Sequence, residues 1–229
     1  MPTPRCYTHK HSLHKSIRLS VMIVSSQNPE IIDLPDGRLR YVSSLLTETD
    51  ALIHRLTTSL NWYQGDVFLF GRHHKTPRLQ CWYGDKAYTY SQVRLEPTPW
   101  PPLLQQLRTI VEEASGHAFN SVLGNWYQHG QHNMGMHADN EPELGQNPVV
   151  AMLTFGTARP LQFRHRNGVD RFTIIPEDGS LLIMEGPIQH YWRHGIHKSK
   201  TISAPRISLT FRQILSVNHA HTARRQSKK

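Results

Sequence analysis

Hydrophobic residues follow a helical period in two parts of the chain. From near Thr47, a Thr-x-x-Asp start can cap a helix that places Leu52, Ile53, Leu56 and Leu60 on one face. A second apolar stripe repeats from about Pro101 to Ala114, and Gly116 is well placed to end that helix. The pattern therefore predicts two amphipathic helices in the first half of the chain.

After Gly116 the period changes to that of short strands separated by turn signals such as Asn167-Gly168 and Asp178-Gly179. The predicted strands cover residues 119–127, 148–156, 160–165, 171–175, 180–185 and 206–214. Two helices followed by many short strands favour an α+β fold with the helices packed outside a barrel-like sandwich. The longest apolar runs have only strand length, so we expect no membrane association.

The chain carries a formal net charge of +9, with histidine counted as neutral. A positive surplus favours polyanionic partners such as nucleic acid, because each neutralised phosphate releases a condensed counterion. Part of the surplus lies at the two ends, and a basic protein without a nucleic-acid role remains an alternative. The first 29 residues contain no acid, and the chain ends in Arg224, Arg225, Lys228 and Lys229.

We therefore expect a flexible basic arm over residues 1–30, one domain over 31–216 and a basic tail over 217–229. Cys6 and Cys81 are the two cysteines of the sequence, too few for a disulfide framework or a thiolate zinc site. This favours an intracellular, reducing compartment: the cytoplasm or nucleoid, or the nucleus in a eukaryote. We expect the protein to act as a monomer.

An imidazole and a carboxylate stand two residues apart in His137-Ala138-Asp139. On an extended segment both side chains point the same way and can hold two adjacent positions on a metal ion. A distant histidine would complete the two-histidine, one-carboxylate site of non-haem Fe(II) oxygenases. Spacing leaves His190, His194 and His197 all open for this position, and a chance surface pair is the alternative.

The last predicted strand alternates strictly, with Ile207, Leu209 and Phe211 on one face. The opposite face consists of Arg206, Ser208, Thr210 and Arg212. Two guanidinium groups on one strand face need water or an anion, and their planar fork matches a carboxylate of 2-oxoglutarate. A strand with one solvated face is the alternative. Asn125 and Tyr127, also two residues apart, offer neutral partners for a dicarboxylate.

Together these motifs resemble the AlkB family of Fe(II)- and 2-oxoglutarate-dependent dioxygenases. The matching motifs are Asn125-x-Tyr127, His137-x-Asp139-x-Glu141, His194-Gly195-Ile196 and Arg206-x5-Arg212, in the family's order and spacing. The similarity extends from about Pro77 to Ile214 and is closest to the branch with the animal nuclear repair homologues. It implies a double-stranded β-helix (jelly-roll) core with the helices packed on one side.

The resemblance also implies the ligands of the cofactor and the cosubstrate. His137, Asp139 and His194 would bind Fe(II). Arg206 and Tyr127 would hold the distal carboxylate of 2-oxoglutarate. Arg212 and Asn125 would hold the other end of the molecule. Ser208 departs from the family, which usually has asparagine at this position.

On the substrate side, the resemblance implies a hairpin at about residues 77–92 that receives a flipped base. Its candidate base-contacting residues are Arg78, Trp82, Tyr88, Tyr90 and Ser91. Sheet packing is the alternative for these aromatic residues. Glu141 matches an acidic position that would attract a positively charged alkylated base, with a role as a partner of Arg212 as the alternative.

The implied function is oxidative dealkylation of bases such as N1-methyladenine and N3-methylcytosine in DNA, with RNA left open as a substrate. The reaction would use Fe(II), O2 and 2-oxoglutarate and release succinate, CO2 and formaldehyde. Alternatives are a dioxygenase for protein or small molecules, a non-catalytic binder of damaged nucleic acid, and a zinc hydrolase. The preferred lesion and strandedness stay open.

Overall fold

The structure is a computed structural model that describes residues 28–69, 71–90 and 93–215. The predicted basic arm up to residue 27, the predicted tail at 217–229 and Ser91 lie outside the described residues, as does the side chain of Tyr90. No helix within the described ranges is long and apolar enough to cross a membrane.

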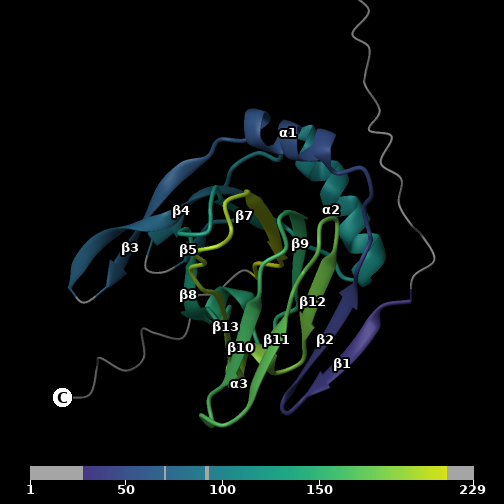
Figure 1. The fold of residues 1–229 in the computed structure, drawn as a ribbon, viewed down its shortest axis with the longest axis vertical. Coiled ribbons are helices and arrows are strands. Elements are labelled where there is room, and N and C mark those ends of the chain that lie inside the picture. The colour runs from purple at the N-terminus through teal and green to yellow at the C-terminus, as the bar shows by residue number, and fades with distance from the viewer. Residues whose placement is uncertain (1–27, 70, 91–92, 216–229) are drawn as a thin grey trace, which may run out of the picture.

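Antiparallel strands form two main sheets that face each other (Figure 1). The large sheet has the order β1 (Glu30–Leu34), β2 (Gly37–Val42), β12 (Leu181–Glu185), β9 (Val150–Gly156), β14 (Arg206–Arg212), β7 (Ser121–Tyr127), β4 (Arg72–Gly84) and β3 (Tyr63–Leu69). The small sheet has the order β11 (Arg171–Ile174), β10 (Leu161–His165), β13 (Trp192–Ile196) and β8 (Met134–His137). Two facing antiparallel sheets of this kind form a jelly-roll core.

One hydrophobic cluster lies between the two sheets. It combines Tyr127 and Met152 of the large sheet with Phe163 and Trp192 of the small sheet. Because strand side chains alternate between faces, the other face of the large sheet needs a separate cover. Side chains of this cluster therefore hold the two sheets together.

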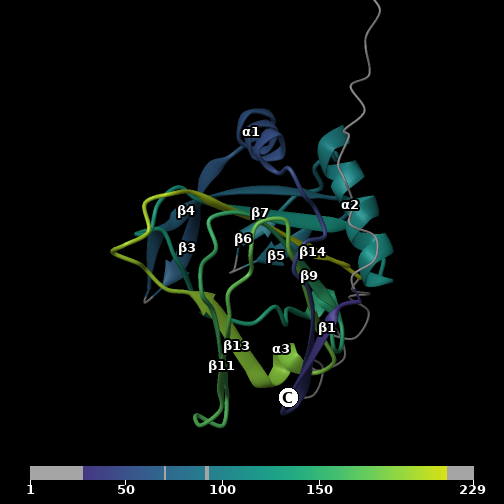
Figure 2. The ribbon, with the colours of Figure 1, turned by 45° about the vertical axis from the view of Figure 1, so that its right-hand side comes forward.

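That cover comes from helices α1 (Asp50–Ser59) and α2 (Pro102–Ser115). Leu56 of α1 and Leu107 of α2 belong to a second cluster with Phe155 and Leu209 of the large sheet. Figures 1 and 2 show α1 and α2 together at one end of the fold and the short helix α3 (Ile188–Tyr191) at the other. A 3-10 turn, η1 (Pro142–Leu144), follows β8.

The predicted strands and the second helix are confirmed, with differences of one to two residues at their ends. Gly116 ends α2 in the left-handed conformation, with φ of 74°, and its N–H donates to the Glu112 carbonyl. Gly168 likewise has φ of 81° in the turn between β10 and β11. Both glycines occupy backbone conformations that side chains with a Cβ rarely adopt.

The predicted start of α1 at Thr47 is wrong. The helix begins at Asp50, and Thr49, which occupies the N-cap, makes no side-chain capping bond. Its hydroxyl donates instead to the Asp178 carboxylate, and Glu48 has a positive φ of 53° that a helix cannot contain. The side chain of the N-cap residue Thr49 therefore makes a tertiary hydrogen bond rather than a local capping bond.

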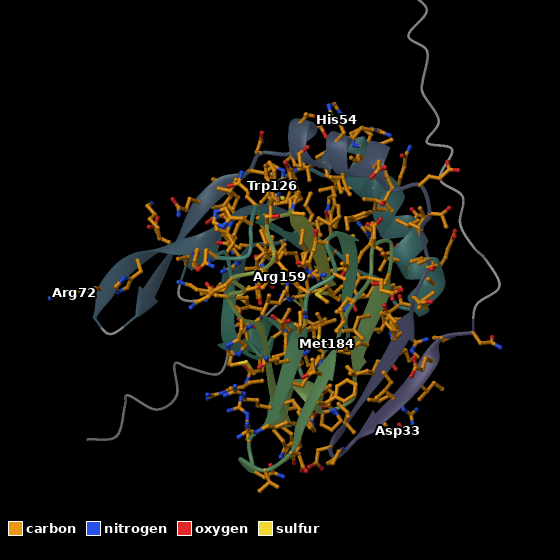
Figure 3. The ribbon with its side chains drawn as sticks, in the orientation of Figure 1. Asp33, His54, Arg72, Trp126, Arg159 and Met184 are labelled. Atoms are coloured by element: carbon orange, nitrogen blue, oxygen red, sulfur yellow. The ribbon has the colours of Figure 1, made fainter. Side chains whose placement is uncertain are left out.

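The predicted hairpin at residues 77–92 is also wrong as a single unit. The end of β4 pairs with β7 and the rest with β3, whereas β5 (Tyr88–Tyr90) pairs with β6 (Val93–Leu95) in a separate small sheet. The β3–β4 hairpin extends away from the body of the fold, with Arg72 at its tip (Figure 3).

Candidate active site

Three side chains with metal-binding atoms converge on the inner side of the small sheet. His194 of β13 is the cross-strand partner of His137 at the end of β8, and Asp139 follows two residues later. The ligand atoms of these residues all lie within 4.8 Å of one another. The structure therefore brings the predicted triad to one point.

Strand pairing decides which second histidine joins the cluster. His194 is buried, and its ring centroid lies 4.4 Å from that of His137. His190 and His197 are exposed, and the ring of His190 accepts the backbone N–H of Asn147 instead. The sequence left all three histidines open, and the pairing of β13 with β8 selects His194.

Hydrogen bonds orient two members of the cluster. Nδ1 of His137 lies 3.0 Å from the carbonyl of Gly135, an arrangement that places the proton on Nδ1 and leaves Nε2 free to bind a metal. The backbone N–H of Asp139 donates to Oε1 of Gln189 at 2.9 Å, and both residues are buried. Gln189, on α3, thus fixes the segment that carries the carboxylate.

Charge in the cluster is balanced by Arg212, which donates to Oδ1 of Asp139 at 2.7 Å. Burial would raise the pKa of Asp139, but Arg212 and the two histidines lower this pKa to about 2. Burial, and then the neighbouring His137, lower the pKa of His194 to about 3. Burial also lowers the pKa of His137. The carboxylate is therefore ionised and the imidazoles neutral, the protonation states that bind a metal ion.

The cluster fits a divalent cation. Oδ2 of Asp139 is buried without a hydrogen-bond partner among the described residues, which is costly for a carboxylate unless a cation occupies the position beside it. Two imidazole nitrogens and one carboxylate oxygen are the donor set of non-haem Fe(II) sites with open positions. Both the donor atoms of these residues and the unpartnered carboxylate oxygen therefore indicate a site for a divalent metal ion.

The second buried arginine of β14 lies opposite Tyr127 in the paired strands. Arg206 is 1% exposed and donates to the Pro176 carbonyl at 3.3 Å and to the Thr154 hydroxyl at 3.1 Å. Its Nε is buried without a partner, and no carboxylate of the described chain pairs with it. Burial lowers the pKa of Arg206 to about 10, so this cation is well suited to a bound anion.

A narrow space of about 30 Å³ runs between β14 and the metal-binding cluster. Its lining includes the predicted residues Asn125, Tyr127, Ser208 and Arg212, together with the cluster itself. Met152 and Met184, unbranched side chains that adapt their shape readily, also line it.

A larger cavity of about 390 Å³ lies next to this space and shares His137 and Met134 with it. Arg78 and Gln80 of β4 line it, and Arg78 donates through Nε to Oδ1 of Asn125 at 2.6 Å. One hydrogen bond therefore connects the wall of the larger cavity to the wall of the narrow space.

Trp82 and Tyr88, two of the aromatic residues predicted to contact a base, line neither space. Trp82 is buried, stacks on Tyr88 with centroids 5.4 Å apart, and donates to the Glu96 carbonyl. Trp82 shares the β4 face of Arg78, but Leu123, Leu144 and Ile214 cover it at its end of the strand. The sheet-packing alternative accounts for Trp82 and Tyr88.

Glu141 lies against Tyr88 and lines neither space. Burial, and then the neighbouring Asp139, raise the pKa of its carboxyl, while Arg212 and Tyr88 lower it. Burial likewise raises the pKa of the Tyr88 hydroxyl. Glu141 therefore interacts electrostatically with Asp139 and Arg212 but lines neither cavity.

Three residues of the site had not been singled out from the sequence. Thr210, which alternation had placed on the polar strand face without a role, lines the narrow space. Gln80 lines the larger cavity, and alternation from Arg78 would have found it. Gln189 carried no signal, because its partner Asp139 is 50 residues away.

Comparisons with known proteins identify the group to which this arrangement belongs. Residues 39–212 match the model of the 2OG-Fe(II) oxygenase superfamily. Alpha-ketoglutarate-dependent dioxygenase alkB homolog 3 from Bos taurus is 38% identical over 179 residues, 74% of this chain. DNA oxidative demethylase ALKBH2 from Mus musculus is 36% identical over 181 residues, 73% of this chain and 76% of the relative.

The chain spans less than two thirds of the alkB homolog 3 relative, 63% of its length. A solved structure titled "The structure of OsALKBH1" superposes with a TM-score of 0.58, covering 80% of this chain and 100% of that one. At 17% identity this likeness supports the fold. Fe(II) and 2-oxoglutarate are the cofactor and cosubstrate that the matched family implies. The chain belongs to the 2OG-Fe(II) oxygenase superfamily and, within it, to the AlkB-type proteins.

Proposed function

We propose that this protein removes alkyl groups from damaged nucleobases by oxidation, with Fe(II), O2 and 2-oxoglutarate. The observation that carries the proposal is the convergence of His137, Asp139 and His194, together with a buried Arg206, on the same strand as Arg212, that has no carboxylate partner among the described residues. A metal-binding cluster and a buried guanidinium without a carboxylate partner suit a metal cofactor and an anionic cosubstrate.

Each group of residues has a distinct task in this reaction. His137, Asp139 and His194 would hold the iron, and Arg206 with Tyr127 would bind the distal carboxylate of 2-oxoglutarate. Arg212 and Asn125 would lie at its other end, with Ser208 between the two arginines on the same strand face. The apolar side chains between the sheets, such as Phe163, keep bulk water away from the cluster.

When bound, iron with 2-oxoglutarate supplies the oxidation, in which one atom of O2 enters succinate and the other hydroxylates the N-alkyl carbon, with loss of CO2. A hydroxymethyl group on a ring nitrogen then leaves as formaldehyde and restores the base. The residues of the chain need only bind, orient and shield the reactants. No side-chain nucleophile is required.

The larger cavity is the proposed entry point for the damaged base. It opens beside His137 and is lined by Arg78, which is already hydrogen-bonded to the cosubstrate side through Asn125. Helices on one side of the jelly roll would leave this opposite side free for a nucleic-acid strand. The net charge of +9 and the names of the relatives support DNA as the partner of a monomeric enzyme, with RNA as a second candidate.

Formaldehyde release from methylated oligonucleotides tests the proposal. The purified protein would be incubated with Fe(II), ascorbate, 2-oxoglutarate and oligonucleotides that contain N1-methyladenine or N3-methylcytosine. Single-stranded DNA, double-stranded DNA and RNA would be compared in parallel. We expect one formaldehyde for each succinate formed with a damaged strand, and background release with an unmodified strand.

His137→Ala provides the matched inactive variant, and His190→Ala the control histidine outside the cluster. His137→Ala should abolish release and His190→Ala should retain it. Retained turnover in His137→Ala would refute the metal site. Succinate formation that no methylated oligonucleotide stimulates would instead favour a dioxygenase for protein or small molecules.

A further inference from the structure

Arg159, in the segment before β10, is a buried cation without a role in the proposed reaction. It is 1% exposed and lies in the interior of the fold (Figure 3). The guanidinium donates to three backbone carbonyls: His132 at 2.9 Å, Gly130 at 3.3 Å and His197 at 2.7 Å. It also lies 5.4 Å from the centroid of the Tyr127 ring, in cation–π geometry.

The three carbonyls belong to the two connections that flank Tyr127. Gly130 and His132 lie between β7 and β8, and His197 lies between β13 and β14. The connections also bond to each other, because the N–H of Gly130 donates to the Ile202 carbonyl at 2.9 Å and the N–H of Ser199 donates to the Gly130 carbonyl at 2.8 Å. Arg159 thus joins β10 to both connections at once.

Gly130 shows how closely these connections pack. A Cβ added there would lie 2.4 Å from the carbonyl oxygens of both Ile202 and Ser199, closer than real contacts allow. The guanidinium of Arg159 therefore holds a tightly fitted pair of connections in place, and both of them lead directly into the candidate site. One starts at Tyr127 and ends in β8; the other starts after Ile196, two residues past His194, and ends at Arg206.

The charge of Arg159 points in the same direction. Burying a guanidinium is costly, and no carboxylate in the described ranges pairs with this one. Carbonyl oxygens satisfy its donors but do not neutralise it. Arg206 is a second buried cation, and it is the cross-strand neighbour of the same Tyr127. Two positive charges around one tyrosine, without a resident acid, favour an anion at this end of the site.

We infer that Arg159 is a positioning residue for the cosubstrate: it holds Tyr127 and the two connections where the distal carboxylate of 2-oxoglutarate binds. The inference rests on the proposed function for the identity of that anion. A role limited to stability predicts a different outcome. If Arg159 only stabilised the fold, its replacement would weaken the binding of every ligand of the site to the same degree, or of none of them.

The distal carboxylate itself provides the test. Binding of 2-oxoglutarate and of 2-oxobutyrate, which has the same 2-oxo acid group but no distal carboxylate, would be measured by calorimetry on Mn(II)-loaded protein. Arg159→Met should raise the Kd for 2-oxoglutarate at least about tenfold, or 1.4 kcal/mol by the conversion at 25 °C. The Kd for 2-oxobutyrate and the Kd for Mn(II) should each change less than about twofold, a difference near experimental error.

Arg40→Met is the control for the loss of a partly buried guanidinium outside the site. Arg40 donates to the Ser115 carbonyl at 2.6 Å and to Glu185 at 2.8 Å, away from the site. It should lower stability and leave the Kd for 2-oxoglutarate unchanged. Arg159→Lys keeps the charge but not the three-way fork, so it provides a milder variant if Arg159→Met does not fold.

The outcomes separate this inference from the proposed function. Wild-type protein that does not bind 2-oxoglutarate would refute the proposed function. Wild-type binding with unchanged affinity in both Arg159 variants would overturn the role of Arg159 alone. An equal loss for 2-oxoglutarate and 2-oxobutyrate would overturn it as well, since the effect would not depend on the distal carboxylate.

Discussion

Replacing Arg212 with methionine should strongly destabilise the metal-free protein. Its guanidinium donates to Asp139 at 2.7 Å, and the two side chains are 3% and 0% exposed. Removing one partner of a buried ion pair costs about 3–5 kcal/mol, because the remaining charge has no counterion and little water. We therefore expect Arg212→Met to lower the free energy of unfolding in EDTA by an amount in this range.

A divalent ion should recover much of this loss, since it places positive charge beside the same carboxylate. Urea unfolding would be followed first in EDTA and then with increasing Mn(II). Stabilisation by a ligand grows with the logarithm of its concentration relative to Kd. Mn(II) should stabilise Arg212→Met more than the wild type, in which Arg212 already compensates Asp139.

Arg108→Met is the control, because Arg108 pairs with Glu112 at 2.9 Å on the partly exposed side of α2. A pair of this kind contributes about 0–1 kcal/mol, and Mn(II) should not affect the difference. The reasoning is refuted if Arg212→Met unfolds like the control in EDTA. It is also refuted if Mn(II) stabilises Arg212→Met and the wild type equally.

Two further predictions concern residues next to the site. Trp82→Phe should leave the KM for a methylated oligonucleotide unchanged and lower stability by about 1 kcal/mol, the typical contribution of one hydrogen bond. A raised KM in steady-state assays would indicate instead that Trp82 contacts the substrate. Gln189→Met removes the acceptor for the N–H of Asp139 and should weaken Mn(II) binding about 10–100-fold. Calorimetry measures this directly, and an unchanged Kd would leave Gln189 with a packing role.

Local patterns in the sequence predicted what depends on neighbouring residues. Strict alternation in β14 placed Leu209 and Ser208 on opposite faces of the strand, and in the structure Leu209 lies in the helix-covered core while Ser208 lines the narrow space. The stripe between Pro101 and Ala114 predicted α2, because a buried helix face repeats every turn. The jelly-roll class followed from the resemblance rather than from the pattern alone.

What the sequence did not reveal depends on contacts between distant segments. His194 could not be separated from His190 and His197 until the pairing of β13 with β8 was known. The N-cap is Thr49 rather than Thr47, and the Thr49 hydroxyl donates to Asp178, far along the chain. Likewise, β4 pairs with β7 rather than with its neighbour β5, so a local hairpin prediction was wrong.

The position of β14 has a consequence for how the protein forms during synthesis. The last strand of the described chain lies in the middle of the large sheet, between β9 and β7. Until the ribosome has released residue 212, both neighbours have an open edge that can pair with other chains. Arg206 and Arg212, the proposed cosubstrate-binding residues, arrive with the same strand. A chain terminated before β14 would therefore be both prone to aggregation and inactive, because it would lack the central strand and its two arginines.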